Sequence, residues 1–269
     1  MKRFYDSANN RLVYINNNKV GNRFWDVHWN KYDIEQMIKS VVLNRMILVP
    51  TKKYLSIGSR ILEGGCGLGQ NVWSLKQAGY NVFGVDYAME TVEKVNDIVP
   101  ELNVSVGDVR QLTFENNFFD GYWSLGVIEH FYNGFDSIAH EMKRVIKPGG
   151  YLFLTFPCMS WFRRRKVMLG SYKIWKETSS GLDNFYQFAL SGEIVESQFF
   201  NNGFVLVEKK SIAGLKGFKD EIGHKTAQGL LQQLYDSTNI ILRVMAWGLD
   251  KLLAPFAGHC KLLIFKKIN

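Results

Sequence analysis

The sequence ILEGGCGLGQ at residues 61–70 joins a short apolar segment to a loop rich in glycine. Residues 60–63 have the length and composition of a buried strand, and residues 71–79 carry apolar side chains at helical spacing. Glycine in such a loop lets a ligand approach the backbone closely, and the start of the following helix presents free N–H groups. The segment therefore predicts a ligand site between a strand and a helix.

The spacing of the glycines argues against a dinucleotide site. Gly65, Gly67 and Gly69 alternate with other residues, whereas the dinucleotide pattern G-x-G-x-x-G requires a glycine at the position of Gln70. Glu63 also stands directly before the loop, and a carboxylate there suits a ligand that carries a cation rather than a pyrophosphate. The loop alone is a weak signal, so its neighbours in the sheet decide the interpretation.

Strands and helices alternate after the loop, which predicts a parallel sheet with its ligand edge at the carboxyl ends of the strands. Strands are expected at residues 81–86, 104–108, 118–124, 150–156, 204–208 and 261–266, and helices at residues 89–98, 135–145 and from 191. Asp86 and Asp108 end two of these strands, so that three carboxylates, with Glu63, are expected at one edge. Asp86 can accept hydrogen bonds from both hydroxyls of a ribose. Asp108 and the Val109 N–H can bind an adenine edge.

Five segments of the chain resemble the successive signatures of class I S-adenosylmethionine-dependent methyltransferases, closest to the small-molecule, type 11/12-like branch. These segments are ILEGGCGLGQ (61–70), FGVDY (83–87), VGDVRQLTF (106–114), FDGYWSLGVIEHF (119–131) and RVIKPGGYLFLTFP (144–157). The resemblance covers residues 58–157 strongly and residues 191–212 and 260–268 more weakly. It implies an α/β fold with a Rossmann-like seven-stranded sheet of order 3-2-1-4-5-7-6, whose last strand is antiparallel. It also implies S-adenosylmethionine as the cofactor and S-adenosylhomocysteine as its product.

The resemblance further implies which residues bind the cofactor. Glu63 would lie near the methionine amino group, and Asp86 would hold the ribose. The whole implied set is Glu63, Gly65, Cys66, Gly67, Asp86, Tyr87, Met89, Asp108, Val109 and Leu125. The apolar residues 125–128 depart from the family, which usually has a longer polar stretch at that place.

Methyl transfer from a sulfonium is an in-line displacement, so positioning and desolvation can supply much of the acceleration. A general base is needed only if the acceptor is a protonated hydroxyl or amine. His130, just beyond the fourth strand, is the candidate catalytic base. The alternative is a histidine that is hydrogen-bonded in a helix start or faces solvent. No metal site is expected, because the three cysteines have neither CxxC spacing nor a nearby histidine.

Three segments lie outside the predicted sheet. Residues 1–55 are expected to form a helical extension or lid, and residues 56–269 the cofactor domain, with inserts at 158–190 and 213–260. In the extension, residues 33–49 have helical spacing and Pro50 would end the helix. An aromatic cluster there either packs on the next domain or covers a ligand. Its members are Phe24, Trp25, Trp29 and Tyr32.

Both inserts suggest contacts beyond the cofactor. Residues 160–176 include six basic residues and no acidic one, and arginines beside aromatics suit a phosphate, a carboxylate or an anionic lipid headgroup. Arg163, Arg164 and Trp175 are the predicted acceptor ligands, with a solvated basic helix as the alternative. Residues 230–253 are amphipathic. They predict a helix packed on this domain or on a second subunit, or else docked on a membrane surface.

Composition narrows the function classes. The net charge of +8 is mostly local, and the Asn/Asp-Pro-Pro-aromatic signature of nucleic-acid amino methyltransferases is absent, so a nucleic-acid substrate is not expected. No signal peptide or apolar stretch of spanning length occurs, so a cytoplasmic location is expected. The expected activity is methyl transfer to an O, N or C atom of a small molecule, with an anionic, lipid or glycan-linked acceptor included.

Two alternatives stay open from the sequence. The first is a nicotinamide-dependent oxidoreductase on a related Rossmann fold, against which Gln70 and Asp108 argue. The second is a non-catalytic cofactor-binding module that docks on a membrane or a partner through residues 160–176 or 230–253. Binding of S-adenosylhomocysteine but not of NAD would exclude the oxidoreductase.

Overall fold

The computed structural model describes residues 1–17, 19–20, 24–40 and 44–268, and the chain divides into two compact units. The first unit comprises Met1–Lys19, Thr155–Ser197 and Glu208–Leu263. The second unit comprises Val20–Leu154, Gln198–Val207 and Ile264–Asn269. Four of the five boundaries fall within three strands and one helix, which are β7 (Ile146–Pro157), β10 (Phe204–Ile212), β11 (Cys260–Lys267) and α9 (Gly192–Asn201).

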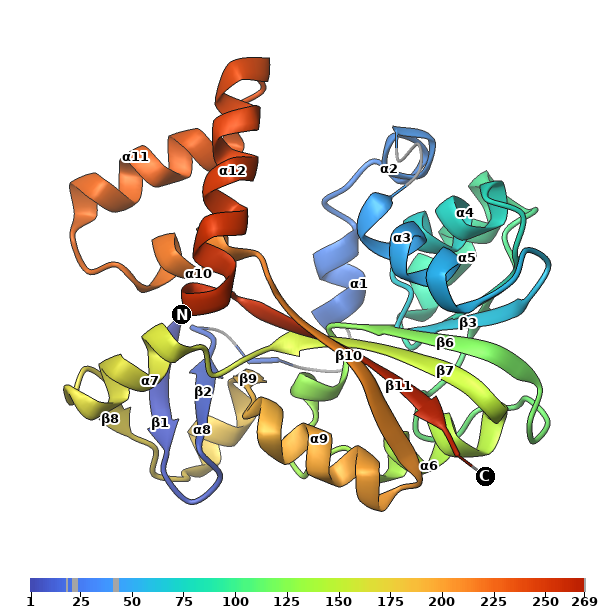
Figure 1. The fold of residues 1–269 in the computed structure, drawn as a ribbon, viewed down its shortest axis with the longest axis horizontal. Helices are drawn as coiled ribbons and strands as arrows, with labels where there is room; N and C mark the ends of the chain where they lie inside the picture. The colour runs from blue at the N-terminus through green and yellow to red at the C-terminus, as the bar shows by residue number, and fades with distance from the viewer. Residues whose placement is uncertain (18, 21–23, 41–43, 269) are drawn as a thin grey trace. The chain divides into compact units, whose positions relative to one another are not determined.

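The second unit contains the predicted alternation of strands and helices (Figure 1). Its elements are α1 (Phe24–Trp29), α2 (Ile34–Ser40), α3 (Arg45–Tyr54), β3 (Arg60–Gly64), α4 (Gln70–Gln77), β4 (Asn81–Asp86), α5 (Met89–Ile98), β5 (Val104–Val106), β6 (Phe119–Leu125), a 3-10 turn (Ile128–His130) and α6 (Asp136–Val145). The helices form because one face of each is apolar; in α6 the buried residues Ile138, Met142 and Val145 recur at helical spacing.

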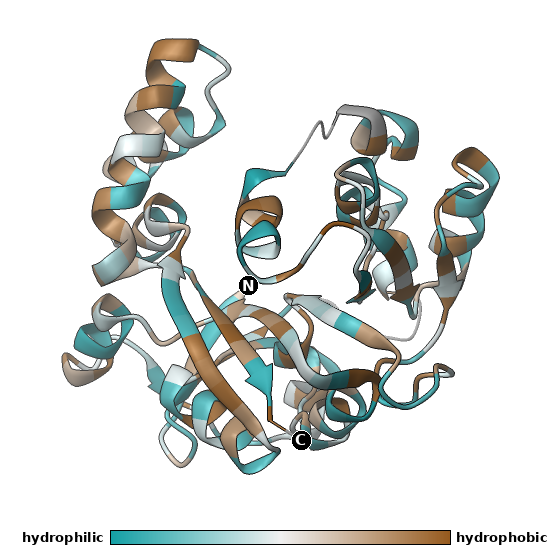
Figure 2. Ribbon diagram, turned by 45° about the vertical axis from the view of Figure 1, so that its right-hand side comes forward, coloured by the Kyte–Doolittle hydropathy of each residue, from teal (hydrophilic) through white to brown (hydrophobic). Residues whose placement is uncertain are grey.

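The first unit contains a second sheet and most of the two inserts. Its elements are β1 (Lys2–Asp6), β2 (Arg11–Ile15), α7 (Trp161–Met168), β8 (Lys173–Ile174), α8 (Ser179–Asp183), β9 (Phe185–Ala189), α10 (Gly214–Glu221), α11 (Lys225–Asp236) and α12 (Ile240–Ala257). The strand order of this sheet is β8-β1-β2-β9. Leu12, Tyr14, Met159 and Ala189 form one of its buried apolar clusters. Helix α12 begins with the apolar residues 240–242, which are brown in Figure 2.

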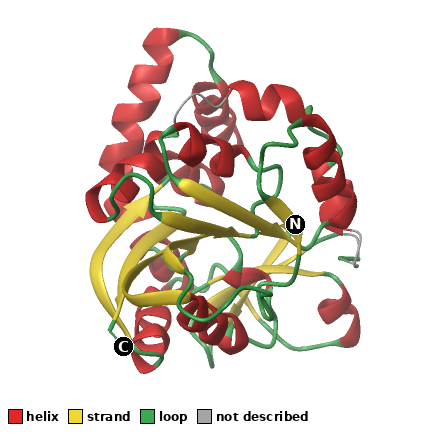
Figure 3. Cartoon of the chain, turned by 90° about the vertical axis from the view of Figure 1, so that its right-hand side faces the viewer, coloured by secondary structure: helices red, strands yellow, loops and turns green. Residues whose placement is uncertain are grey.

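The seven-stranded sheet has the order β5-β4-β3-β6-β7-β11-β10, which confirms the predicted order 3-2-1-4-5-7-6. Its strands are among those drawn in yellow in Figure 3. Strand β3 is parallel to both of its neighbours, and its residue Glu63 pairs with Gly84 of β4 and with Trp123 of β6. Strand β11 is antiparallel to β7. Its start meets the end of β7, where the Cys158 N–H donates to the His259 carbonyl, and its end meets the start of β7.

The predicted helical character of residues 1–55 is wrong for the first fifteen residues, which form the β1–β2 hairpin. Asp6 accepts hydrogen bonds from the Ala8 and Asn9 N–H groups, and Asn10 takes a φ of 47°, so this polar segment is a turn. The structure also divides the chain differently from the predicted boundary at residue 55. The hairpin belongs to the first unit, because β2 pairs with β9 and β1 with β8.

Two predicted helices also differ from the structure. Pro50 lies inside α3 and does not end a helix, and residues 41–43 of the predicted helix 33–49 are outside the described residues. The amphipathic segment 230–253 is not one helix, because α11 ends at Asp236 and α12 begins at Ile240. Asn239 starts the new helix by accepting hydrogen bonds from two N–H groups of its first turn. None of the helices that the structure describes is both long and apolar enough to cross a membrane.

Candidate functional site

The glycine loop between β3 and α4 has a backbone that side chains would strain. Gly65, Gly67 and Gly69 have φ angles of 75°, 53° and 75°, in the left-handed region that favours glycine. The N–H groups of Gly65 and Cys66 donate to the Val85 carbonyl of β4 over 2.7 and 3.1 Å. The loop is therefore held against the end of β4 by backbone hydrogen bonds.

Asp86, the last residue of β4, fixes the same loop through its side chain. Its carboxylate accepts the Gly67 N–H at 2.7 Å with one oxygen and the Ala88 N–H at 2.9 Å with the other. Burial raises the pKa of Asp86 above its ordinary value, although these backbone donors oppose the effect. The structure thus brings the predicted second carboxylate directly against the glycine loop.

Glu63 lies at the end of β3 with only 1% of its surface exposed. One carboxylate oxygen accepts a hydrogen bond from the Asn71 side chain at 2.8 Å. The other oxygen, Oε2, is buried and has no hydrogen-bond partner among the described residues. Burial, with repulsion from Asp86 as a smaller cause, raises the pKa of Glu63 to about 8. Buried polar atoms in folded proteins are almost always paired, so this oxygen is a candidate ligand acceptor.

The strand predicted at residues 104–108, with Asp108 as its last residue, is shorter in the structure. Strand β5 ends at Val106, so Asp108 lies two residues beyond it. Its carboxylate forms an ion pair with Arg110 at 2.6 Å, and this hydrogen-bonded guanidinium lowers the pKa of Asp108. Among the other predicted cofactor residues, Val109 and Cys66 are buried, Leu125 is half-buried, and Tyr87 and Met89 are exposed.

Helix α1 lies over the glycine loop. A Cβ atom added to Gly67 would be 2.7 Å from Cζ2 of Trp29, so this indole contacts the loop directly. Asp26 anchors the helix by accepting hydrogen bonds from the N–H and the hydroxyl of Thr91, both at 3.1 Å, at the start of α5. The predicted aromatic cluster therefore both packs on this unit and covers the loop.

The 3-10 turn after β6 carries His130 and a second buried carboxylate. His130 is half-buried, and its ring meets Trp25 of α1 edge to face at 4.7 Å between ring centroids. Glu129 is only 2% exposed, and its Oε2 has no hydrogen-bond partner in the described ranges. Burial raises the pKa of Glu129 to about 8. Sequence reasoning did not select Glu129, although its place beside His130 was a usable signal.

Comparison with known proteins identifies the domain that contains this site. Residues 62–154 match a family model described as a methyltransferase domain. The chain is 28% identical over 105 residues to methyltransferase GfsG of Streptomyces halstedii, covering 36% of this chain and 37% of that protein. It is 26% identical over 148 residues to the ubiquinone biosynthesis O-methyltransferase of Actinobacillus pleuropneumoniae, covering 51% of this chain and 62% of that one. Residues 62–154 are a class I S-adenosylmethionine-dependent methyltransferase domain.

The fold extends this similarity over almost the whole chain. The solved structure of the [4+2]-cyclase SpnF superposes with a TM-score of 0.57 at 15% sequence identity, covering 95% of this chain and 98% of that one. At this identity the likeness shows the fold alone. The chain spans between about a third and two thirds of the length of the two curated relatives above.

The residues of the methyltransferase domain fit S-adenosylmethionine. The cofactor carries an ammonium group, and Glu63 offers a buried carboxylate oxygen that lacks a partner within the described part of the chain. It carries a ribose, and Asp86 is the carboxylate at the end of the next strand. Its close approach to the backbone needs small residues, which the three glycines with positive φ provide.

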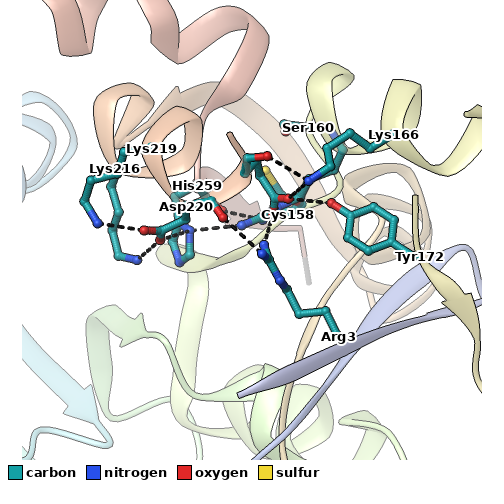
Figure 4. A network of polar contacts seen from close by, with 11 residues as sticks. Arg3, Cys158, Ser160, Lys166, Tyr172, Lys216, Lys219, Asp220 and His259 are labelled. Atoms are coloured by element: carbon teal, nitrogen blue, oxygen red, sulfur yellow. Dashed lines mark hydrogen bonds and ion pairs between the residues drawn. The ribbon is translucent and has the colours of Figure 1, made fainter. Parts of the chain in front are cut away.

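The predicted acceptor residues belong to the first unit and not to the methyltransferase domain. The structure corrects the predicted role of Arg163 in acceptor binding. Its side chain is buried in an internal network of hydrogen bonds and ion pairs, part of which Figure 4 shows. It pairs with Glu221 at 3.0 Å, donates to the Cys158 carbonyl at 2.7 Å and contacts the His259 ring nitrogen at 3.0 Å. Its guanidinium is therefore committed to protein groups and does not face an acceptor.

The other two predicted acceptor residues are more accessible. Arg164 is partly exposed and pairs with Glu193 while donating to the Met159 carbonyl at 3.1 Å. Trp175 is half-buried, with its ring packed edge to face against Phe4 at 5.5 Å. Their predicted role in acceptor binding stays a prediction.

Proposed function

We propose that this chain transfers the methyl group of S-adenosylmethionine to an O, N or C atom of a small-molecule acceptor. The observation that carries the proposal is the buried Glu63 carboxylate, with one oxygen left without a partner in the described structure, beside a glycine loop that Asp86 holds in place. When bound, the cofactor supplies a sulfonium-activated methyl group. The protein residues need only position the two reactants and exclude water.

Each predicted cofactor residue takes a role in this proposal. The Glu63 carboxylate accepts hydrogen bonds from the methionine ammonium, and Asp86 accepts them from the ribose hydroxyls. The backbone of Gly65, Cys66 and Gly67 lies along the cofactor. The remaining residues contact the adenine or the methionyl chain, and they are Tyr87, Met89, Asp108, Val109 and Leu125. Trp29, which contacts Gly67, covers this arrangement from above the loop.

Two observations bear on the class of acceptor. The relative from A. pleuropneumoniae is named for an O-methylation in ubiquinone biosynthesis, which favours a small molecule. The first unit contains 18 lysines and arginines but only 10 aspartates and glutamates, which favours an anionic or lipid acceptor.

A labelling experiment tests the proposal. The full chain is incubated with S-adenosylmethionine labelled in its methyl group and with metabolite and lipid extracts, and labelled products are separated by chromatography. Label in a small molecule, absent with the Asp86→Ala variant, supports methyl transfer. Tight binding of S-adenosylhomocysteine without transfer of label would contradict it and would point to a cofactor-dependent reaction of another kind, such as the cyclisation for which SpnF is named.

Cofactor binding should depend on pH through Glu63. Its pKa of about 8 means that the carboxyl group is mostly protonated at pH 7 before binding. A cationic ligand stabilises the carboxylate, so S-adenosylhomocysteine affinity should rise about tenfold per pH unit up to about pH 8 and then level off, with a proton released on binding below pH 8. Calorimetry in buffers of different ionisation enthalpy measures this release.

Two variants distinguish the effect of Glu63 on the pH dependence of binding from that of Glu129, the other buried carboxyl group with a raised pKa. Glu63→Gln should bind S-adenosylhomocysteine more weakly at pH 9 and show no proton release. Glu129→Gln should keep the wild-type pH dependence, although its pKa is also about 8. Loss of the pH dependence in Glu129→Gln alone would show that the ammonium is bound elsewhere.

His130 is assigned as the general base for an acceptor with a protonated hydroxyl or amine. It follows β6 at the edge of the sheet where β3 and β4 also end. His130→Ala should lower kcat about 100-fold without changing the dissociation constant of S-adenosylhomocysteine. His140→Ala, an exposed position on α6, is the matched control and should behave as wild type. Equal rates for His130→Ala and wild type would remove the base from the mechanism.

A further inference from the structure

Helix α12 presents large apolar side chains to solvent. Ile240, Ile241, Val244, Met245 and Trp247 are each more than half exposed. Only Ala254 and Ala257, near the other end of the helix, are buried, and α11 has no buried residue. The end of α12 that follows Asn239 therefore has no buried side chain in the described structure.

The exposed side chains form one broad face at this end of the helix. At 100° per residue they occupy a continuous arc of about 160°, which runs from Trp247 through Ile240, Val244 and Ile241 to Met245. Arg243 is the only charged residue between positions 240 and 249. Such a broad apolar face, with a single cationic side chain beside it, suits insertion into a lipid interface, where tryptophan is a typical side chain.

The apolar surface continues onto α7. The rings of Phe256 and Trp161 are 6.4 Å apart, so the face of α12 that carries Met245 and Leu252 leads directly to Trp161. Arg165 lies over the same indole at 5.2 Å. An indole beside a guanidinium, one apolar and one charged, is the side-chain pairing typical of a membrane–water interface.

The net positive charge of the first unit indicates which kind of membrane it would bind. The first unit carries 18 basic and 10 acidic residues, whereas the second carries 15 of each, so the whole net charge of +8 lies in the unit that contains α7 and α12. Basic groups next to inserted apolar side chains are attracted to anionic lipid headgroups. The same charge opposes the approach of a second copy of this unit.

We propose that α12, with α7, docks the protein onto the surface of an anionic phospholipid membrane. The side chains of Ile240, Ile241, Val244, Met245 and Trp247 enter the boundary between headgroups and acyl chains. Arg243 extends its charged end back to the headgroups, and Arg165 contacts them beside Trp161. The proposal is independent of the proposed methyl transfer, because cofactor binding reports on the second unit alone.

Vesicle sedimentation with the full chain tests this proposal. Wild-type protein should sediment with phosphatidylcholine vesicles that contain phosphatidylglycerol, and much less with phosphatidylcholine alone or at high salt. The double variant Ile241→Ser/Met245→Ser should lower the partition coefficient at least roughly tenfold. Phe200→Ser, at a side chain with 65% exposure on α9, is the matched control and should bind as wild type. The variants on α12 should keep the wild-type circular dichroism spectrum and urea denaturation midpoint, which shows that the first unit is folded, and all variants should bind S-adenosylhomocysteine with wild-type affinity.

Three results would overturn the proposal. Wild-type protein that stays in solution with anionic vesicles has no such docking surface. Equal sedimentation of wild type and the double variant would place the lipid contact elsewhere. A wild-type dimer in analytical ultracentrifugation that the double variant dissociates, without vesicle binding, would identify the surface as a contact between copies of this chain.

Discussion

The Asp86→Ala variant is expected to bind S-adenosylhomocysteine about 1,000-fold more weakly than the wild-type protein. In our proposal the carboxylate accepts two hydrogen bonds from the ribose hydroxyls. Hydrogen bonds to a charged acceptor are worth roughly 2 kcal/mol each, so losing two corresponds to about 1,000-fold in affinity. Isothermal titration calorimetry gives the dissociation constants.

Asp86 also accepts the Gly67 and Ala88 N–H groups, so the substitution removes a support of the loop itself. Asp86→Asn separates the two effects, because its amide oxygen can still accept one N–H while the charge is lost. It should therefore bind more tightly than Asp86→Ala and more weakly than wild type. Asp97→Ala, at an exposed position on the adjacent helix α5, is the control and should leave the affinity unchanged. A folded Asp86→Ala protein with wild-type affinity would refute the assignment.

Local patterns predicted the elements around the cofactor site closely. Strand β4 and helix α5 have the predicted bounds, because Gly79 precedes the strand and Pro100 follows the helix in the sequence. The contact between Asp86 and the glycine loop also follows from local order, since parallel strands end at one edge of the sheet. The contact between Trp29 and Gly67 joins residues far apart in the chain. The sequence left open whether the aromatic cluster that contains Trp29 packs on the next domain or covers a ligand.

Contacts between distant segments explain what the sequence did not predict. The β1–β2 hairpin is stabilised by β8 and β9, more than 150 residues away, and no local pattern shows that pairing. The basic run at residues 163–166 has the composition of a solvated helix face. Arg163 is buried because Glu221, 58 residues further along the chain, meets it.

The Glu221→Gln variant is expected to lose roughly 3–5 kcal/mol of stability, the largest loss that we predict for a single substitution. One carboxylate oxygen accepts from Arg3 at 2.6 Å and from Arg163 at 3.0 Å. The other accepts from Lys166 at 2.9 Å and from the Tyr172 hydroxyl at 2.6 Å. Removing the negative charge leaves the buried Arg163 guanidinium without its counter-ion. Urea denaturation measures the loss, and Glu193→Gln, which breaks the exposed pair with Arg164, should cost less than about 1 kcal/mol.

Acid should weaken the same network. The surrounding cations hold the pKa of Glu221 below its ordinary value despite burial, so its contribution is present above that ordinary pKa and is lost as pH falls through the lower folded value. Burial, with Arg163 as a second cause, lowers the pKa of His259 to about 3. The unfolded chain therefore takes up a proton on His259 first, so the stability of the wild-type protein relative to a His259→Gln variant should begin to fall below about pH 6.5, while the raised pKa values of Glu63 and Glu129 act on both proteins alike. A stability difference between the two proteins that stays constant from pH 7 to pH 4 would contradict this prediction.

A double-mutant cycle decides whether Arg163 acts inside the protein or toward an acceptor. Arg163→Met should destabilise the protein strongly, because it leaves Glu221 buried with one counter-ion fewer. The double variant Arg163→Met/Glu221→Leu removes both buried charges, so it should be more stable than the sum of the two single losses predicts, by roughly 1–3 kcal/mol. A coupling free energy near zero would mean that Arg163 is not committed to Glu221. Its sequence-based assignment to the acceptor would then be the better interpretation, and methylation kinetics of Arg163→Met would have to show it as a raised KM.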